Sequence, residues 1–363
     1  MKWSFRIARI SGIDVRIHLT FLLLLAWWGY SGYSEGGWSE AIFSVTFICL
    51  LFLCVLLHEF GHALAARIYG IGTPDITLLP IGGVARLQRM PDNPTQELVI
   101  AIAGPMVNVV IALGLWLALG MPHLFDLTAL DNPGESILLN LLHVNVMLIA
   151  FNLIPAFPMD GGRVLRALLS FIFDHARATQ IAARIGQVIA VGFLFAGLFG
   201  IPGVMGQNPF LIFIAMFVFL GAQQESAYAG MRAAVAGLRV ADAMITRFQA
   251  MPHDLPIRSA AEEALHDTQP LYPVTDPDLK VLGIVLRNEL LEAAGRTEDG
   301  VVTSLVHAVP AVNIDADFDE AFKLMQESGC GVLPVVNPTG QILGLVSLNL
   351  LRERAQMHKP ARA

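Results

Sequence analysis

Apolar residues gather in long runs before about Tyr228 and in short runs after it. Six of the long runs reach or approach the roughly 20 helical residues that a bilayer core requires, which predicts membrane-spanning helices. From Leu238 onward the apolar runs shrink to strand length, and Asp and Glu recur every few residues. We therefore predict a polytopic α-helical membrane region followed by an α+β region in water. The six predicted spans are Leu19–Tyr33, Ala41–Tyr69, Leu98–Leu119, Ile137–Phe157, Ile185–Phe199 and Pro209–Ala227.

Basic residues are confined to alternate connections between these spans. The connections Ser34–Glu40, Gly120–Ser136 and Gly200–Asn208 contain no Lys or Arg, whereas the N-terminal segment and the other connections do. By the positive-inside rule, this pattern predicts six crossings with both termini in the cytoplasm. The basic start resembles a secretory signal, but no small-residue cleavage site follows, so we expect an uncleaved anchor. We expect a multi-pass protein of a cell membrane, the plasma or inner membrane in a prokaryote.

Composition narrows the classes of function. Hydrophobic residues make up 55% of the chain, charged residues make up 15%, and the formal net charge is -7. No basic cluster of the kind that binds nucleic acid is present in the sequence. Cys49, Cys54 and Cys330 are too few and too scattered for a disulfide framework, which fits a reducing compartment for the soluble part. The predicted organisation is a membrane domain over residues 1–227, a linker over 228–239, a paired domain over 240–355 and a tail over 356–363.

The sequence His58-Glu59-Phe60-Gly61-His62 lies within the second predicted span, where ionisable side chains are costly and usually functional. On a helix, histidines at i and i+4 share one face, so both imidazoles can bind a single zinc ion. Glu59 lies next to them, in position to accept a proton from water. The alternative, polar residues satisfied by neighbouring helices, is less favoured because three ionisable groups lie so close together.

A catalytic zinc site generally needs a third protein ligand and one open position. Asp160 is the best candidate, because it follows the fourth predicted span on the same side of the membrane as the two histidines. Pro155 and Pro158 break the helix before it, and the glycines at 161 and 162 are expected to form a tight turn that aims the carboxylate into the bundle. Cys54, His143 and His18 are alternative ligands, although side chains of these kinds more commonly pack in a core.

The segment between the second and third spans, residues 70–97, combines strand formers at 76–79 with turn residues that include Gly82 and Gly83. We predict a re-entrant β-hairpin beside the metal that receives an extended substrate as an added strand, so both glycines are expected to contact substrate. An ordinary cytoplasmic loop is the open alternative. Asn152 lies on the Asp160 side of the bundle, where its amide either donates to a developing oxyanion or caps a carbonyl freed by Pro155.

Three ordered motifs on three spans resemble the site-2 protease family of intramembrane zinc metalloproteases. They are His58-Glu59-Phe60-Gly61-His62, Gly104-Pro105-Met106-Val107-Asn108, and the segment Asn152–Gly162 with its Asn-x-x-Pro and Asp-Gly-Gly elements. The resemblance implies one zinc ion per chain, with His58, His62 and Asp160 as ligands, Glu59 as general base and Asn152 at the reaction centre. We also expect Asn108 to contact substrate. The implied substrates are single-span membrane proteins cut in or near their transmembrane segments, commonly regulators already clipped by another protease.

The region after Leu238 contains an internal repeat, because residues 271–285 align without gaps on residues 332–346. Each copy is predicted to fold as strand, turn, strand and helix, the last helix starting near Asn288 or Asn349, after earlier helices at 260–266 and 319–327. The repeat resembles a tandem pair of cystathionine-β-synthase (CBS) domains, at about 240–296 and 297–355.

CBS pairs often bind adenine nucleotides between the two copies. The positions that contact the nucleotide in that family hold Leu286 and Glu289 in the first copy and Ser347 and Leu350 in the second, so no complete ribose-binding pair is present. Glu289 and Ser347 are the candidate nucleotide contacts. A module for homodimerisation and docking, with no nucleotide, is the open alternative.

A membrane transporter or channel gated by the same module is the rival interpretation, with the buried histidines and aspartate serving ion passage. Transport predicts polar residues along several spans at the membrane midplane, whereas here they gather near the cytoplasmic end. Intramembrane proteolysis by a zinc endopeptidase is therefore the favoured function, with activity modulated by the cytoplasmic CBS pair.

Overall fold

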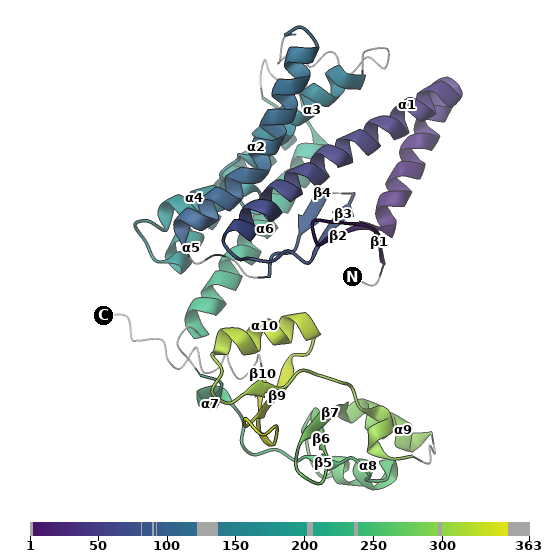
Figure 1. Ribbon diagram of the computed structural model, residues 1–363, viewed down its shortest axis with the longest axis vertical. Helices are drawn as coiled ribbons and strands as arrows, with labels where there is room; N and C mark the ends of the chain where they lie inside the picture. Colours follow the sequence, from purple (N-terminus) through teal and green to yellow (C-terminus); the bar gives the residue numbers. More distant parts are fainter. Residues whose placement is uncertain are drawn as a thin grey trace. The chain divides into compact units, whose positions relative to one another are not determined.

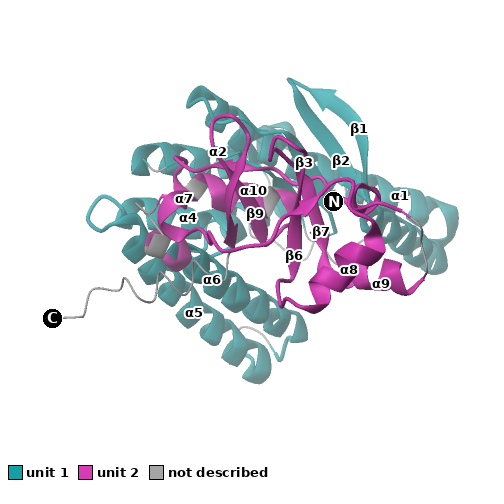
Figure 2. Ribbon diagram, turned by 90° about the horizontal axis from the view of Figure 1, so that it is seen from below, with its two compact units in different colours: residues 1–229 teal, residues 230–363 magenta. Residues whose placement is uncertain are grey.

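The computed structural model describes residues 3–80, 82–88, 91, 93–121, 137–201, 206–235, 239–296 and 300–347. The chain divides into two compact units, residues 1–229 and 230–363 (Figure 2). The first unit is mainly helical with a four-stranded sheet, and the second contains two three-stranded sheets with helices (Figure 1). The predicted combination of an apolar helical region and an α+β region is therefore confirmed.

Helix α1, Leu19–Ile68, covers the first predicted span and all but the last residue of the second. Its backbone leaves helical geometry at Gly36 and Gly37, and the φ angle of 71° at Gly37 is one that glycine adopts without strain. The two arms of α1 meet there at a sharp bend (Figure 1). His18 caps the first arm, because its Nδ1 accepts a hydrogen bond from the Thr20 amide at 3.3 Å.

The other helices of the first unit largely follow the predicted apolar runs. Helix α3 ends at Asn152, earlier than predicted, because Pro155 and Pro158 cannot donate backbone hydrogen bonds. Within the described part of the chain, four helices including α1 are long and apolar enough to cross a membrane, and α3 is a shorter apolar helix. The bounds are α2 Pro94–Ala118, α3 Ile137–Asn152, α4 Asp160–Leu169, α5 His175–Phe199 and α6 Pro209–Val235.

A sheet with strand order β1-β2-β3-β4 packs against α1. Strands β1 and β2 form an antiparallel hairpin in the basic N-terminal segment, which hydropathy alone does not predict. Strand β2 pairs in parallel with β3, and β3 pairs antiparallel with β4, so a hairpin is present where the sequence predicts one. Its inner face buries Ile13 and Ile76 against Ala63 of α1. The bounds are β1 Ser4–Ile10, β2 Ile13–His18, β3 Asp75–Leu79 and β4 Gly82–Ala85.

The second unit contains the two predicted repeats. The first copy forms a sheet in the order β5-β6-β7 and the second in the order β10-β9-β8. Ile342 of the second copy donates a backbone hydrogen bond to the Leu279 carbonyl of the first at 3.0 Å, and Leu345 packs with Leu271 and Ile284 in one cluster. The two copies therefore share a core.

The helices and strands of the second unit match the predicted pattern. The helix predicted from Asn349 and the tail over 356–363 lie outside the described residues, as do residues 236–238 of the predicted linker. The bounds are α7 Val240–Ala243, β5 Met251–Pro252, α8 Ile257–Leu265, β6 Leu271–Thr275, β7 Val281–Leu286, α9 Arg287–Gly295, a short 3-10 helix Val302–Leu305, β8 Val312–Asn313, α10 Phe318–Ser328, β9 Val332–Val336 and β10 Ile342–Ser347.

Candidate metal centre

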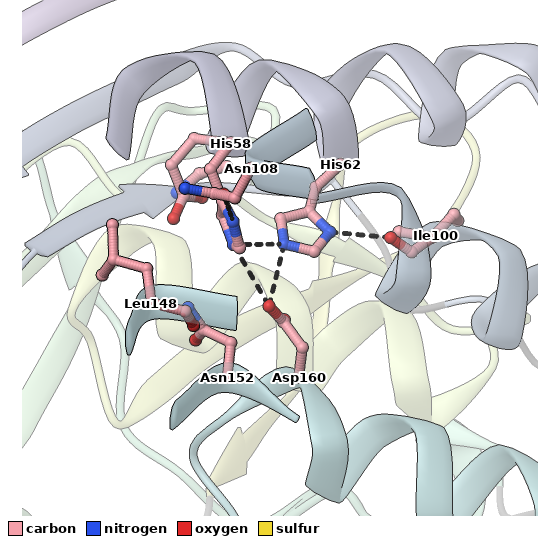
Figure 3. A network of polar contacts seen from close by, with 9 residues as sticks. His58, His62, Ile100, Asn108, Leu148, Asn152 and Asp160 are labelled. Atoms are coloured by element: carbon pink, nitrogen blue, oxygen red, sulfur yellow. Dashed lines mark hydrogen bonds and ion pairs between the residues drawn. The ribbon is translucent and has the colours of Figure 1, made fainter. Parts of the chain in front are cut away.

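His58, His62 and Asp160 bring three ligand atoms together in the first unit (Figure 3). His58 Nε2 lies 3.1 Å from His62 Nε2, and Asp160 Oδ2 lies 3.2 Å from each of these nitrogens. A tetrahedral zinc ion with bonds of about 2.0–2.1 Å holds its ligand atoms about 3.3 Å apart. The three atoms therefore match one face of a zinc tetrahedron, and no other group of this kind occurs among the described residues.

The hydrogen bonds of the two imidazole rings leave lone pairs facing the carboxylate. His62 Nδ1 donates to the Ile100 carbonyl at 2.7 Å, so the lone pair of the neutral ring is on Nε2. His58 Nδ1 lies 2.6 Å from the Asn108 amide oxygen, which has the same effect. Two lone pairs and a carboxylate oxygen repel one another at 3.1–3.2 Å, and a cation between them turns that repulsion into attraction. Two histidines and a carboxylate are also a known ligand set for catalytic zinc.

Glycines let α1 and α2 approach closely enough to build this site. A Cβ on Gly61 of α1 would lie 2.7 Å from the Ala103 carbonyl oxygen of α2. A Cβ on Gly104 of α2 would lie 2.1 Å from His62 Nε2. Both distances are shorter than real Cβ contacts, so only glycine fits at these two positions without a shift. The close approach is what allows the Ile100 carbonyl to reach the His62 ring.

Asp160 is the first residue of helix α4, so the predicted tight turn at the two glycines that follow it is wrong. Gly161 and Gly162 belong to the first helical turn. A Cβ at 161 would lie 2.2 Å from the Ile154 carbonyl oxygen, and a Cβ at 162 would lie 2.7 Å from the Ala156 carbonyl carbon. The glycines are therefore needed because the segment between α3 and α4 passes directly over them.

Glu59 is half-buried on α1 and contacts strand β4. Its Oε2 accepts a hydrogen bond from the Ala85 amide at 3.1 Å. Gly83 permits this contact, since a Cβ there would lie 2.6 Å from Glu59 Cγ. The Arg86 amide bonds to β3, so by strand alternation the backbone groups of Ala85 and Gly83 face the other edge of β4. That edge pairs with no other strand in the described part of the chain.

Asn152 lies close to Asp160 at the end of α3 (Figure 3). Its Nδ2 donates to the Leu148 carbonyl at 3.0 Å, one helical turn back. The carbonyl that Pro155 leaves without its helical donor, that of Phe151, accepts instead from the Ile154 amide at 3.2 Å. The side chain of Asn152 is therefore not occupied in capping that carbonyl.

Three other residues considered from the sequence lie deeper in the bundle. Asn108 is fully buried, and its amide contacts His58 and Asn145. Cys54 is buried with its Sγ 3.5 Å from Asn145 Nδ2, outside the group of three ligands. His143 is buried, and neither of its ring nitrogens has a hydrogen-bond partner. None of the three belongs to the candidate metal site.

A second buried polar group in this unit is centred on Arg166 of α4, and its pairing cannot be recognised from the sequence alone. Arg166 is only 2% exposed, and its Nε donates to Glu97 Oε1 of α2 at 2.7 Å. It also pairs with Glu225 of α6 and lies 5.0 Å from the centre of the Phe157 ring. A charged residue close to an apolar segment is the sequence signal for such a group. The pairing of Arg166 with Glu97 and Glu225 cannot be recognised in this way, because the three residues lie far apart in the sequence.

The candidate nucleotide contacts lie in the second unit. Glu289 Oε2 lies 2.6 Å from His307 Nε2, beside a cavity of about 350 Å³. Ser347 is the last residue of β10, and Leu350 lies outside the described residues. Nucleotide contact by Glu289 and Ser347 stays a prediction. The cavity is lined by Glu289, Glu292, Ala293, Arg296, Ser304, Leu305, Val306 and His307.

Comparison with known proteins gives consistent matches over both units. Residues 46–128 and 121–193 match the model of peptidase family M50, and residues 302–355 match the CBS domain model. A zinc metalloprotease of Methanocaldococcus jannaschii is 34% identical over 326 residues, covering 90% of this chain and 89% of that protein. The putative zinc metalloprotease Rip3 of Mycobacterium tuberculosis is 29% identical over 370 residues, covering 96% and 91%.

A solved structure is also similar, the site-2 protease from Methanocaldococcus jannaschii. It is 38% identical, covers 62% of this chain and 95% of that chain, and has a TM-score of 0.45. The transporter or channel interpretation is set aside, because the matched proteins are metalloproteases. The ligand set, the full-length similarity and the family match together place this chain in peptidase family M50, the site-2 protease family of zinc metalloproteases.

Proposed function

We propose that this metalloprotease hydrolyses peptide bonds in or near the transmembrane segments of single-span membrane proteins. The observation that carries the proposal is that His58, Glu59 and His62 lie on α1, an apolar helix long enough to cross a membrane, and that Asp160 meets the two histidines there. Ionisable groups are costly in an apolar membrane-spanning helix, so their presence there indicates catalysis within the membrane. An extended peptide released from a membrane helix fits the chemistry of this site.

His58, His62 and Asp160 would hold the zinc ion in this mechanism. When bound there, zinc lowers the pKa of water and polarises the scissile carbonyl. Glu59 accepts a proton from the attacking water and delivers it to the leaving amine, which makes it the general base and then the general acid. Asn152 donates a hydrogen bond to the developing oxyanion after its amide turns from the Leu148 carbonyl.

The substrate pairs with the open edge of β4 as an added strand. The backbone groups of Gly83 face this edge and are available to such a strand, next to the Glu59 carboxylate. Pairing here also competes with Glu59 for the Ala85 amide, so substrate arrival frees the carboxylate for catalysis. Gly82, also expected to contact substrate, lies in the same strand. Asn108 is buried and contacts His58, so it acts on the reaction through that ligand.

Glu59→Gln in the full-length protein tests the catalytic assignment. Purified enzyme and a tagged single-span membrane protein, already clipped on its far side, are reconstituted and cleavage is followed together with zinc content. We expect Glu59→Gln to keep zinc and lose roughly 10²- to 10⁴-fold in rate, the usual contribution of a general base. Glu35→Gln, an exposed carboxyl on the first arm of α1, is the matched control. Equal cleavage by both variants, with zinc bound, would contradict the assignment.

The orientation in the membrane is part of the same proposal. Six crossings with both termini in the cytoplasm follow from the distribution of Lys and Arg. Single cysteines introduced at Ser34 and Arg177, in a variant whose native cysteines are replaced, should label from opposite sides of the membrane with an impermeant thiol reagent. Labelling of both from one side would refute the orientation.

We further propose that the CBS pair modulates cleavage and links two chains. The support for modulation is the cavity beside Glu289, and the support for a link between chains is the match to the CBS domain model. If the pair is an adenine nucleotide sensor, ATP, ADP or AMP added to the full-length enzyme should give heat of binding and change the cleavage rate, and Glu289→Ala should reduce both. If none of the three nucleotides gives heat, the sensor role is refuted and dimerisation is the remaining role. Light scattering of the purified protein tests dimerisation by measuring its mass in solution.

A further inference from the structure

A chain of buried amides leads from His58 to the backbone of another helix. The Asn108 amide oxygen lies 2.6 Å from His58 Nδ1, and Asn108 Nδ2 donates to Asn145 Oδ1 at 2.9 Å. Asn145 Nδ2 in turn donates to the Leu141 carbonyl at 2.8 Å. Both asparagines are 0% exposed, so no bulk water competes for these hydrogen bonds. The chain joins α1, α2 and α3 behind the metal site.

The direction of every hydrogen bond in this chain is set by its far end. A backbone carbonyl can only accept, so Leu141 must face the nitrogen of the Asn145 amide. Cys54 Sγ, 3.5 Å away, is a second weak acceptor for the same nitrogen. The oxygen of Asn145 therefore faces Asn108 and requires its nitrogen. That leaves the oxygen of Asn108 facing His58, whose Nδ1 must carry a proton.

The proton on Nδ1 decides whether His58 can bind a metal. A neutral imidazole with its proton on Nδ1 has a lone pair on Nε2, the atom 3.2 Å from Asp160 Oδ2. His62 reaches the same state directly, because its Nδ1 donates to the Ile100 carbonyl. An asparagine is a less certain partner than a carbonyl, since a half-turn of its amide would present a donor to His58. Among the described residues, Asn145 is the hydrogen-bond acceptor for the Asn108 nitrogen, and this bond opposes that turn.

We propose that Asn145 is a positioning residue for the metal centre, which fixes the Asn108 amide and through it the tautomer of His58. The inference rests on the proposed role of His58 as a zinc ligand. The described hydrogen-bond partners of Asn145 are Asn108, Cys54 and Leu141, and none of them is a metal ligand or part of β4. It acts indirectly, through the Asn108 amide that donates to it.

Asn145→Leu in the full-length protein removes the amide at similar volume and leaves Asn108 Nδ2 buried without an acceptor. The Asn108 amide then turns, and His58 Nε2 becomes protonated where the metal needs a lone pair. We expect the zinc dissociation constant, measured by chelator competition, to rise about 10- to 100-fold. Asn140→Leu is the matched control, because Asn140 is a buried asparagine on the same helix whose Oδ1 has no hydrogen-bond partner. It should bind zinc within about twofold of the wild type.

Adding Asn108→Asp to Asn145→Leu separates tautomer control from packing. Both oxygens of an aspartate accept, so Asp at 108 holds the proton on His58 Nδ1 without help from Asn145. We expect the double variant to recover most of the lost zinc affinity. A packing defect would not be rescued by another buried charge. Wild-type affinity in Asn145→Leu, or no recovery in the double variant, would overturn the inference.

His58→Ala distinguishes failure of this inference from failure of the site. Loss of zinc in His58→Ala with unchanged binding in Asn145→Leu would overturn the positioning role alone. Zinc retained by His58→Ala at wild-type affinity would overturn the metal site and the inference with it. Circular dichroism and thermal unfolding of each variant in detergent establish that zinc affinities are compared between folded proteins.

Discussion

Gly104→Ala should weaken zinc binding by at least about 100-fold by displacing a ligand, although the substitution adds a single methyl group. The new Cβ would lie 2.1 Å from His62 Nε2, 2.5 Å from Cε1 and 2.7 Å from Cδ2. Ordinary contact begins at 3.4 Å, so the ring must retreat by about 1.3 Å. A zinc–ligand bond tolerates only about 0.2 Å, so the displaced ring no longer completes the site.

The magnitude follows from this mismatch. A ring that moves so far loses its place in the ligand set and its hydrogen bond to the Ile100 carbonyl. Loss of an orienting partner alone costs about 10- to 100-fold in metal affinity, so we expect a loss of at least about 100-fold when the ligand itself is displaced. Helix propensity acts in the other direction, because alanine is favoured over glycine in a helix by about 1 kcal/mol. Weak zinc binding should therefore appear in a protein that remains helical.

Gly114→Ala is the matched control, since a Cβ at this position of α2 meets nothing within 4 Å. Purified full-length variants in detergent are titrated with zinc against a chelator, and circular dichroism reports their helix content. Gly114→Ala should match the wild type in zinc affinity. Equal zinc affinities for Gly104→Ala and Gly114→Ala would refute the argument from close approach.

Two further predictions concern buried polar groups. Arg166→Met should destabilise the first unit by about 3–5 kcal/mol, because Glu97, which is 5% exposed, is left buried without its partner. Thermal unfolding in detergent measures this loss, and adding Glu97→Leu to the same chain should restore much of it. In the second unit, burial, with a smaller contribution from Asp267, raises the pKa of the Tyr272 phenol above its usual value of 10.0. Because the folded state holds the Tyr272 proton more tightly than the unfolded state, the folded state keeps its full stability below pH 10 and loses part of it as the pH rises further. Pulse proteolysis should therefore detect opening of the unit above pH 10 in the wild type. Tyr272→Phe should be less sensitive to that change, and identical pH profiles would count against the assignment.

Much of the metal centre could be predicted from the sequence because its spacing has a direct geometric meaning. The interval of four between His58 and His62 places both rings on one helical face, and the apolar run around them identifies the position as costly. Asp160 could be predicted from its sidedness, and the structure brings it to within 3.2 Å of both rings. The strands and helices of the second unit could also be predicted, because the same pattern occurs in two aligned copies.

The sequence is less informative where tertiary contacts override local preference. Two adjacent glycines cost about 1 kcal/mol each in a helix, so Gly161 and Gly162 indicate a turn when read alone. They lie in a helix because the Ile154 carbonyl leaves no room for a side chain. Asn145 gives no local signal at all, since its importance comes from a hydrogen bond to a residue on another helix.

Strand β2 is predictable from a pattern that hydropathy averages conceal. Residues 13–17 alternate apolar and charged side chains, which is the period of a strand with one buried face. Strand β2 buries Ile13 and Val15 on one side and places Asp14 and Arg16 on the other. The basic residues of this segment indicate a cytoplasmic anchor, and the two-residue period indicates the strand within it.

The separation of the three candidate metal ligands along the chain has a consequence for biosynthesis. His58 and His62 leave the ribosome about a hundred residues before Asp160, since 102 and 98 positions separate them from it. Two histidines do not make a catalytic zinc site, so a nascent chain that has inserted only α1 and α2 cannot hold zinc in working order. Hydrolytic competence therefore begins only when α4 has been made and has packed against the earlier helices. A truncated or stalled chain that ends before α4 is therefore inactive toward the other proteins of the membrane.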